Sequence, residues 1–212
     1  LVQEIQPDFV FHLAAQALVR LSYENPLDTM ATNALGSANL LNSFRQVAKP
    51  LVAIMVTSDK AYDNEEWAWG YRETDRLGGA DPYSASKGMA ELVIRSFVKS
   101  YFSVEDSNVR VGIVRAGNVI GGGDWAADRI VPDCIKSWAC NEPVDIRSPM
   151  STRPWQHVLE PLSGYLTLAK NLYNSKKNHG QAYNFGPTSD QNNPVKELIE
   201  EMGRHWDNVQ WN

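Results

Sequence analysis

The chain has 212 residues, of which 43% are hydrophobic and 21% charged, and its formal net charge is −5. This composition is ordinary for a globular protein with one large core, or with one domain and an appendage. The acidic balance offers no basic surface for nucleic acid, and apolar runs such as residues 51–56 are too short to cross a membrane. Cys134 and Cys140 have no histidine at zinc-binding spacing, which indicates free thiols in a reducing, cytoplasmic compartment and no metal site.

The first half of the chain alternates short apolar runs with helical patterns. Apolar runs at 8–13, 51–56 and 109–114 are typical of buried parallel strands. Helical patterns cover 27–47 and 83 to about 102, each starting beside a proline. This alternation predicts parallel strands joined by right-handed crossovers, that is, an α/β doubly wound parallel sheet.

After residue 120 the alternation weakens, and a mixed set of elements follows. We expect helices over 130–138, 158–173 and 195–206, short strands over 144–146 and 181–185, and an ordered loop over 148–157. The chain is therefore predicted to contain a partial Rossmann-like core with the catalytic residues (1–120). A smaller, mixed α/β, mainly substrate-binding part (121–212) follows, incomplete at its C-terminus.

Polar side chains follow the predicted strands at the points where they end. His12 follows the first strand, the Ser58-Asp59-Lys60 string follows the second, and Asn118 follows the third. Ligands bind beyond the carboxyl ends of parallel strands, so these residues share one rim of the sheet. Tyr83 and Lys87 begin the next helix on one face, where an ammonium group favours the phenolate of a tyrosine that otherwise titrates near ~10.

Taken together, these motifs resemble the extended short-chain dehydrogenase/reductases, and among them the nucleotide-sugar 4,6-dehydratases. The resemblance is closest to the CDP-glucose 4,6-dehydratases. It is carried by His12-Leu-Ala-Ala, Tyr83-x-x-x-Lys87, Arg115-x-x-Asn118, and the stretches 57–63, 69–75, 115–125 and 152–158.

The resemblance implies a hydro-lyase with an NAD(P)-binding Rossmann-like fold. The implied reaction converts CDP-glucose to CDP-4-dehydro-6-deoxyglucose, with NAD as a recycled hydride carrier, in deoxysugar and O-antigen precursor synthesis. It also implies a homodimer formed through the helices at 27–47 and 83–102, both of which carry apolar residues beyond one narrow stripe.

The resemblance also assigns roles to individual residues. Ser58, Tyr83 and Lys87 would be the active-site hydroxyl, base and lysine, with Asn33 supporting the lysine through water. Asp59 would be the general acid, and Lys60 occupies the place where most sugar-nucleotide dehydratases have a glutamate. The remaining assignments are His12, Ala14, Ala15 and Asn33, with Tyr83 and Lys87, for cofactor binding, and Asn118, Arg129 and Arg153 for the substrate.

Lys60 leaves two interpretations open. A lysine must be neutral to act as a base, whereas a free lysine titrates near ~10.4. Lys60 is therefore either the base that removes the C5 proton or a charge that supports the enolate.

One family feature has no counterpart in the sequence. A Gly-rich phosphate turn between a first strand and first helix is absent, and the glycines at 121–123 follow the wrong strand. We therefore expect the chain to be an internal fragment lacking its N-terminal cofactor half. The strand at 8–13 would then have an open edge.

Two other classes of function compete with the dehydratase. A sugar-nucleotide epimerase or reductase shares the serine, tyrosine and lysine but does not need Asp59 and Lys60. A non-catalytic Rossmann-like binding module would explain the missing Gly-rich turn but has no need of Ser58, Tyr83 and Lys87.

Overall fold

The structure, a computed structural model, describes residues 1–188, 191 and 193–212. It contains two compact units, one formed by residues 1–116 and 159–185 and the other by residues 117–158 and 186–212. In the described part of the chain, no helix is both long enough and apolar enough to span a bilayer.

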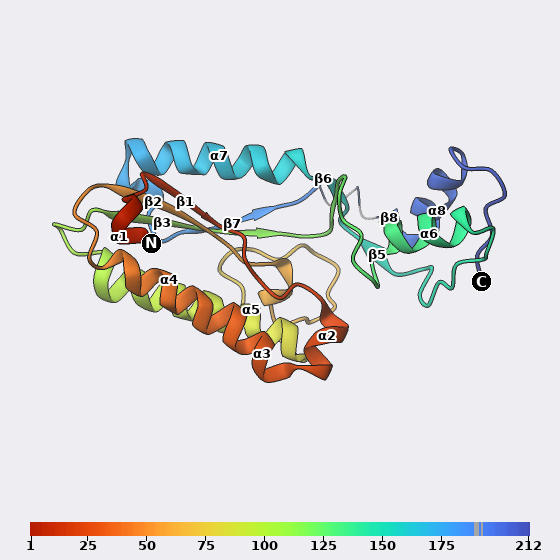
Figure 1. Ribbon diagram of the computed structural model, residues 1–212, viewed down its shortest axis with the longest axis horizontal. Helices are drawn as coiled ribbons and strands as arrows, with labels where there is room; N and C mark the ends of the chain where they lie inside the picture. Colours follow the sequence, from red (N-terminus) through yellow and green to blue (C-terminus); the bar gives the residue numbers. More distant parts are fainter. Residues whose placement is uncertain (189–190, 192) are drawn as a thin grey trace. The chain divides into compact units, whose positions relative to one another are not determined.

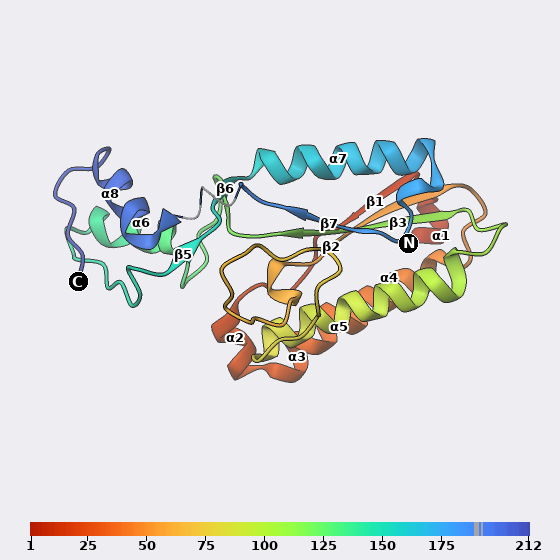
Figure 2. The ribbon, with the colours of Figure 1, turned by 180° about the vertical axis from the view of Figure 1, so that it is seen from behind.

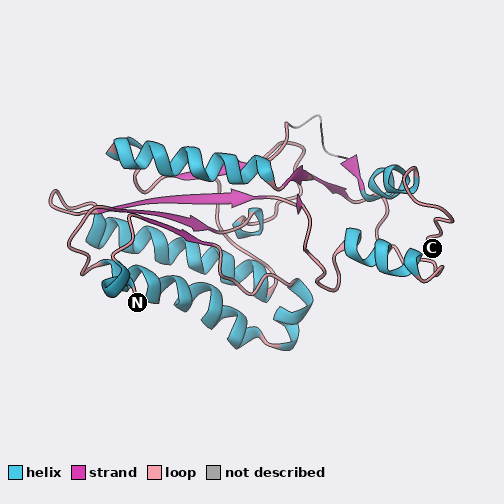
Figure 3. Cartoon of the chain, turned by 45° about the horizontal axis from the view of Figure 1, so that its top comes forward, coloured by secondary structure: helices cyan, strands magenta, loops and turns pink. Residues whose placement is uncertain are grey.

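The first unit is built on a four-stranded parallel sheet. Its strands are ordered β1 (Phe9–His12), β2 (Leu51–Val56), β3 (Val109–Ala116) and β7 (Ala182–Phe185). Helix α7 (Leu159–Asn174) covers one face, and α4 (Gly36–Phe44) and α5 (Pro82–Phe97) cover the other (Figures 1 and 3). The predicted α/β parallel sheet is confirmed.

Strand β2 shows why the sheet is covered on both faces. Its alternate residues Ala53 and Met55 pack with α4 and α5, whereas Val52 and Ile54 pack with α7. Such a strand has no solvent face, and this explains its continuous apolar sequence. On β3, a Cβ at Gly112 would lie 2.8 Å from a Leu168 methyl carbon, so glycine lets α7 approach the sheet closely.

The helix predicted over 27–47 consists of three segments. These are α3 (Pro26–Met30), the π-helical η1 (Ala31–Leu35) and α4, which ends at Phe44. Helix α5 also continues into a π-helical segment, η3 (Val98–Phe102), so the helix predicted to run to about residue 102 is confirmed. Figure 2 shows α4 and α5 side by side along their length. Two short helices and two 3₁₀ turns were not predicted from the sequence: α1 (Val2–Ile5), α2 (Val19–Glu24), η2 (Asp59–Ala61) and η4 (Lys176–Asn178).

The second unit is smaller and packs around its own apolar cluster of Cys134, Trp138, Val144 and Ile199. Its elements are α6 (Ile130–Ala139), α8 (Val195–Gly203), the parallel pair β4 (Val119–Ile120) and β6 (Gln156–His157), and the antiparallel pair β5 (Thr152–Arg153) and β8 (Asn193–Pro194).

Three sequence predictions in the C-terminal half need correction. The strand predicted over 144–146 is a single bridge between Val144 and Trp211, and α8 ends at Gly203 instead of residue 206. The division at residue 120 is also wrong for residues 159–185, which belong to the first unit. The reason is that β7 pairs with β3 and α7 packs on the β2–β3 face.

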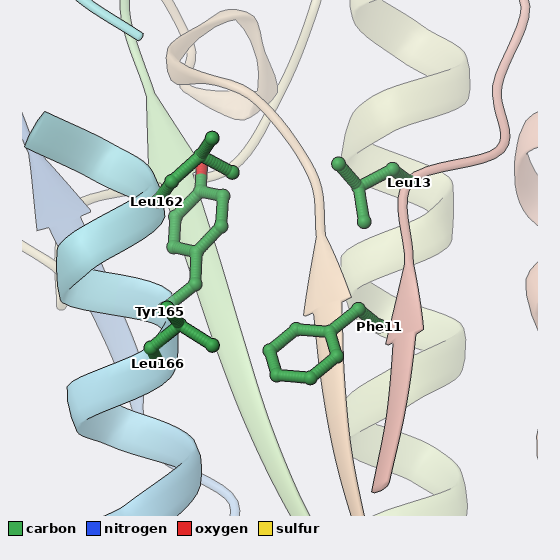
Figure 4. A pocket seen from close by; sticks show the side chains of 5 residues that line it. All are labelled: Phe11, Leu13, Leu162, Tyr165 and Leu166. Atoms are coloured by element: carbon green, nitrogen blue, oxygen red, sulfur yellow. The ribbon is translucent and has the colours of Figure 1, made fainter. Parts of the chain in front are cut away.

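Strand β1 ends the sheet, and within the described residues its outer edge pairs with no other strand. Phe9, Phe11 and Leu13 lie on the α7 side of the sheet, where Phe9 contacts the Tyr173 ring and the other two face Leu162 and Tyr165. They are 42%, 37% and 54% exposed. Figure 4 shows Phe11 and Leu13 lining an apolar groove, with Leu162, Tyr165 and Leu166 of α7 on its other side. The expected open edge is therefore present, and it is apolar.

Candidate active site

The Ser58-Asp59-Lys60 string forms a tight turn at the carboxyl end of β2. The Ser58 side chain caps the 3₁₀ turn η2, accepting the Lys60 N–H at 3.2 Å, and its hydroxyl donates to Asp59 Oδ1 at 3.0 Å. Ser58 is buried and Asp59 half-buried, whereas Lys60 is exposed. The serine and aspartate are therefore fixed relative to each other, while the lysine side chain extends into solvent.

Helix α5 begins with the signals seen in the sequence. Pro82 occupies its first turn, and the Asp81 carboxylate caps it, accepting the backbone N–H and the hydroxyl of Ser84 at 2.9 and 2.6 Å. Tyr83 and Lys87 project from one face of this first stretch, and both are buried. The Lys87 ammonium nitrogen lies 6.0 Å from the centroid of the Tyr83 ring, which confirms that the two are neighbours.

Two glycines let a loop lie directly on α5. Gly79 has φ +139, a conformation that side chains disfavour, and a Cβ there would lie 2.4 Å from the Ala85 backbone nitrogen. On the helix itself, a Cβ at Gly88 would come within 2.7 Å of the Gly78 carbonyl oxygen. The loop that precedes α5 therefore closes over the turn that carries Lys87.

Lys87 is a buried cation with no counter-charge among the described residues. It is 5% exposed, and burial lowers its pKa from 10.5 to about 8. In the described part of the chain, its ammonium group has neither a hydrogen-bond acceptor nor an ion-pair partner. Burial, with a smaller contribution from the charge of Lys87, also lowers the pKa of His12. A positive group with three donors and no protein acceptor fits the ribose hydroxyls of a nucleotide cofactor.

Asn33 ties the segment after β1 to the start of α5. Its Oδ1 accepts the Gln16 N–H at 2.8 Å, and its amide donates to the Gln16 carbonyl at 3.0 Å and to the Ser86 hydroxyl at 2.8 Å. Ser86 in turn donates to the Tyr83 carbonyl at 2.7 Å. These bonds fix the stretch that contains Ala14 and Ala15 beside the helix of Tyr83 and Lys87. The support of Lys87 by Asn33 through water stays a prediction.

The three predicted substrate-binding residues belong to the second unit. Asn118 is half-buried, and its carbonyl accepts the Gln156 N–H at 3.0 Å. Arg129 lies 3.8 Å from Asp124, and the exposed Arg153 donates to the Thr152 carbonyl at 2.7 Å. Their convergence on one ligand stays a prediction.

A buried ion pair next to this site was not predicted from the sequence. Arg115 Nε and Nη2 lie 2.5 and 2.6 Å from the two carboxylate oxygens of Glu91. Arg115 was noted only as part of a motif. Glu91 could have been found from its spacing, because it follows Tyr83 and Lys87 at intervals of four residues on α5.

The fold and these residues together define a Rossmann-type protein with a serine, a tyrosine and a lysine at the carboxyl edge of a parallel sheet. The family model described as GDP-mannose 4,6 dehydratase matches residues 1–186, and the chain belongs to this family. The predicted family resemblance is confirmed.

Individual relatives and solved structures agree with this assignment. The CDP-glucose 4,6-dehydratase of Salmonella typhimurium is 49% identical over 99% of this chain and 60% of its own length. The CDP-paratose 2-epimerase of Salmonella typhi is 25% identical over 89% of this chain and 60% of its own length. The chain thus spans about three-fifths of these relatives.

Among solved structures, the fold matches the UDP-glucuronic acid 4-epimerase of Bacillus cereus, in complex with UDP-glucuronic acid and NAD. The TM-score is 0.82 at 20% identity, over 98% of this chain and 62% of that one. A dTDP-glucose 4,6-dehydratase of Streptomyces venezuelae with NAD bound has a TM-score of 0.78 at 21% identity, covering 98% of this chain and 61% of its own. These similarities confirm the predicted Rossmann-like fold class.

The burial of Lys87 predicts a gain in stability when its charge is removed. At pH 7 the lysine is protonated in both the folded and unfolded states, so folding must desolvate an ammonium group. The difference between its two pKa values corresponds to about 3 kcal/mol, so Lys87→Met is expected to raise the free energy of unfolding by an amount of that order. Between about pH 8 and 10.5 the folded state has lost the proton and the unfolded state has not, so the gain should fade over this range.

Urea unfolding of the wild type and of Lys87→Met at pH 7, 9 and 10.5 measures the difference in their free energies of unfolding. Lys49→Met is the matched control, because Lys49 is an exposed lysine paired with Asp8 and should have little effect at any pH. A Lys87→Met variant no more stable than the wild type at pH 7 would contradict the prediction.

Proposed function

We propose that the protein that carries this sequence is a CDP-glucose 4,6-dehydratase. The observation that carries the proposal is the 49% identity to a protein of that name over 99% of this chain. The arrangement of Ser58, Asp59, Tyr83 and Lys87 supports it, because it brings a hydroxyl, an acid, a phenol and an ammonium group to one edge of the sheet.

Each proton transfer of the proposed reaction is assigned to a side chain of the protein. Tyr83, as a phenolate, takes the proton of the sugar 4-hydroxyl, and Ser58 orients that hydroxyl. Asp59 then protonates the departing 6-hydroxyl after a base has removed the C5 proton, which the 4-keto group has made acidic. The proposed product is CDP-4-dehydro-6-deoxyglucose, a precursor for deoxysugars of the O-antigen type.

NAD is the proposed cofactor, and when bound it supplies the acceptor and later the donor of the sugar's hydride. His12, Ala14, Ala15, Asn33, Tyr83 and Lys87 are the residues proposed to hold its nicotinamide–ribose end. The Lys87 ammonium has no hydrogen-bond acceptor among the described residues, which supports this assignment. Asn118, Arg129 and Arg153 are proposed to bind the nucleotide part of the substrate, and the site of action is proposed to be the cytoplasm.

The proposal is tested by incubating the protein that carries this sequence with CDP-glucose and NAD in deuterated water. A dehydratase should give a 4-keto-6-deoxy sugar nucleotide with one solvent deuteron at C5, which NMR detects. Absorbance should show no accumulation of NADH. An epimerase would give an isomer with no C5 deuterium, and a binding module would give no product. Either of these two outcomes would sink the proposal.

The role of Lys60 can be tested by comparing two variants. If Lys60 is the C5 base, both Lys60→Met and Lys60→Arg should slow C5 exchange by about 10²-fold or more, because arginine keeps the charge but does not give up its proton. If Lys60 only supports the enolate by its charge, Lys60→Arg should keep the exchange and Lys60→Met should lose it. Undiminished exchange in Lys60→Met would remove both roles.

We further propose that the protein dimerises through the outer faces of α3–α4 and α5. Leu27, Leu35, Met89 and Leu92 lie on these helices and are 79%, 60%, 41% and 59% exposed. Exposed apolar side chains of this kind are typical of protein–protein interfaces when they form one patch. Sedimentation equilibrium should give a dimer for the wild type and a monomer for Leu35→Lys/Leu92→Lys. A double variant that remains dimeric would place the interface elsewhere.

A further inference from the structure

The Arg115–Glu91 ion pair is the most deeply buried charged contact on α5. Arg115 is 1% exposed and Glu91 is fully buried, and the guanidinium donates two hydrogen bonds to the carboxylate. The pair connects β3 to α5 at the position four residues after Lys87. It touches neither Tyr83 nor Lys87 directly among the contacts that the structure describes, yet it belongs to the helix that carries both.

The two partners also hold both ends of the turn that carries Ser58, Asp59 and Lys60. At the start of the turn, the Thr57 hydroxyl donates to Glu91 Oε1 at 2.7 Å. At its end, Arg115 Nη1 donates to the Tyr62 hydroxyl at 2.6 Å, and the guanidinium lies 4.7 Å from the centroid of the Tyr62 ring.

The contact with Tyr62 is reinforced from the other side. The Tyr62 hydroxyl donates to Asn184 Oδ1 at 2.7 Å, and Arg115 Nη1 also donates to the Glu73 carbonyl at 3.2 Å. Asn184 binds the Glu73 side chain through its backbone N–H at 2.9 Å. The hydroxyl of Tyr62, which ends the turn, is therefore held by both Arg115 and Asn184.

We propose that Arg115 and Glu91 are positioning residues that fix the Thr57–Tyr62 turn against helix α5, so that Asp59 and Ser58 keep their places relative to Tyr83 and Lys87. The effect of this positioning on catalysis rests on the proposed function. The distances between an acid and a base on different elements depend on whatever joins those elements, and about 1 Å of misplacement can cost about 10²-fold in rate.

Stability alone does not require a charged pair at this position. Replacing a buried ion pair by apolar side chains of similar volume is often neutral or stabilising, because both charges must be desolvated. In Arg115→Met/Glu91→Leu the Thr57 hydroxyl keeps the Val114 carbonyl at 3.2 Å, and the Tyr62 hydroxyl keeps Asn184. The double variant thus loses the ties to the turn and leaves these two hydroxyls with partners.

Amide hydrogen exchange in the 212-residue chain tests the inference without any assay of turnover. The reporters are the N–H groups of Lys60, Ala61 and Tyr62, which bond to Ser58 and Asp59 inside the turn. In the double variant these amides should exchange about tenfold faster, while those of β2 and β3 and the melting temperature stay unchanged. Tyr62→Phe keeps the ion pair and should increase the exchange rate of the same amides by a smaller factor. If the double variant does not fold, this variant tests whether the contacts of the Tyr62 hydroxyl hold the turn, and unchanged exchange would overturn the inference.

The matched control is Arg95→Gln. Arg95 lies 3.6 Å from the same Glu91 carboxylate, but its side chain is 41% exposed and it is an i,i+4 neighbour on α5 itself. Its replacement should leave exchange in the turn unchanged. Unchanged exchange in the folded double variant, or an equal increase throughout the sheet, would overturn the positioning role.

A second measurement separates this inference from the proposed function. If the wild type turns over CDP-glucose, the double variant should lose about 10²-fold in kcat with KM within about twofold of wild type, and an unchanged kcat would overturn the inference. If the wild type shows no turnover, the proposed function fails, and the exchange experiment still decides whether the pair holds the turn.

Discussion

The structure around α5 depends on which hydrogen-bond acceptors surround its two buried cations, Arg115 and Lys87. Arg115 is enclosed by a carboxylate, a phenol and a carbonyl, whereas Lys87 has no acceptor among the described residues. A buried charge is tolerated when its hydrogen bonds are made within the protein, and it is costly when they are not. The first cation can therefore join three elements into one frame, and the second stays available to a ligand.

Arg115 therefore has a structural role, whereas Lys87 is available for the proposed chemistry. The bonds of Asn33 and of the Arg115–Glu91 pair connect the segments that follow β1 and β2 with β3 and α5. Rigid surroundings of this kind are what a proton transfer needs, because the donor and acceptor must already be near their reacting distance. Lys60 belongs to the turn that this frame holds, but its side chain is exposed.

Sequence alone was sufficient where the pattern is local. The unbroken apolar run at Leu51–Val56 indicated a buried strand, and the Asp81-Pro82 pair marked the start of α5 to within one residue. The neighbourhood of Tyr83 and Lys87 followed from helical spacing. The sequence did not reveal which distant residues meet: Glu91 and Arg115 are partners because β3 passes beside α5, and nothing near either residue indicates it. Two-residue strands such as β4 and β6 were missed for the same reason, since each exists only through its pairing.

The π-helical segment η1 fixes the helical phase of everything that follows it. A π turn contains one more residue than an α turn, which rotates the rest of the helix by about 100° relative to an uninterrupted α-helix. In this chain Asn33 and Ala34 are buried within the π segment, and Ser37, Leu41 and Phe44 are buried after it. The extra residue lets one helix present an amide to Gln16 and Ser86 and then an apolar stripe to the sheet. Loss of a single residue between 31 and 35 would put these two requirements out of register, so the length of this segment matters as well as the Asn33 side chain within it.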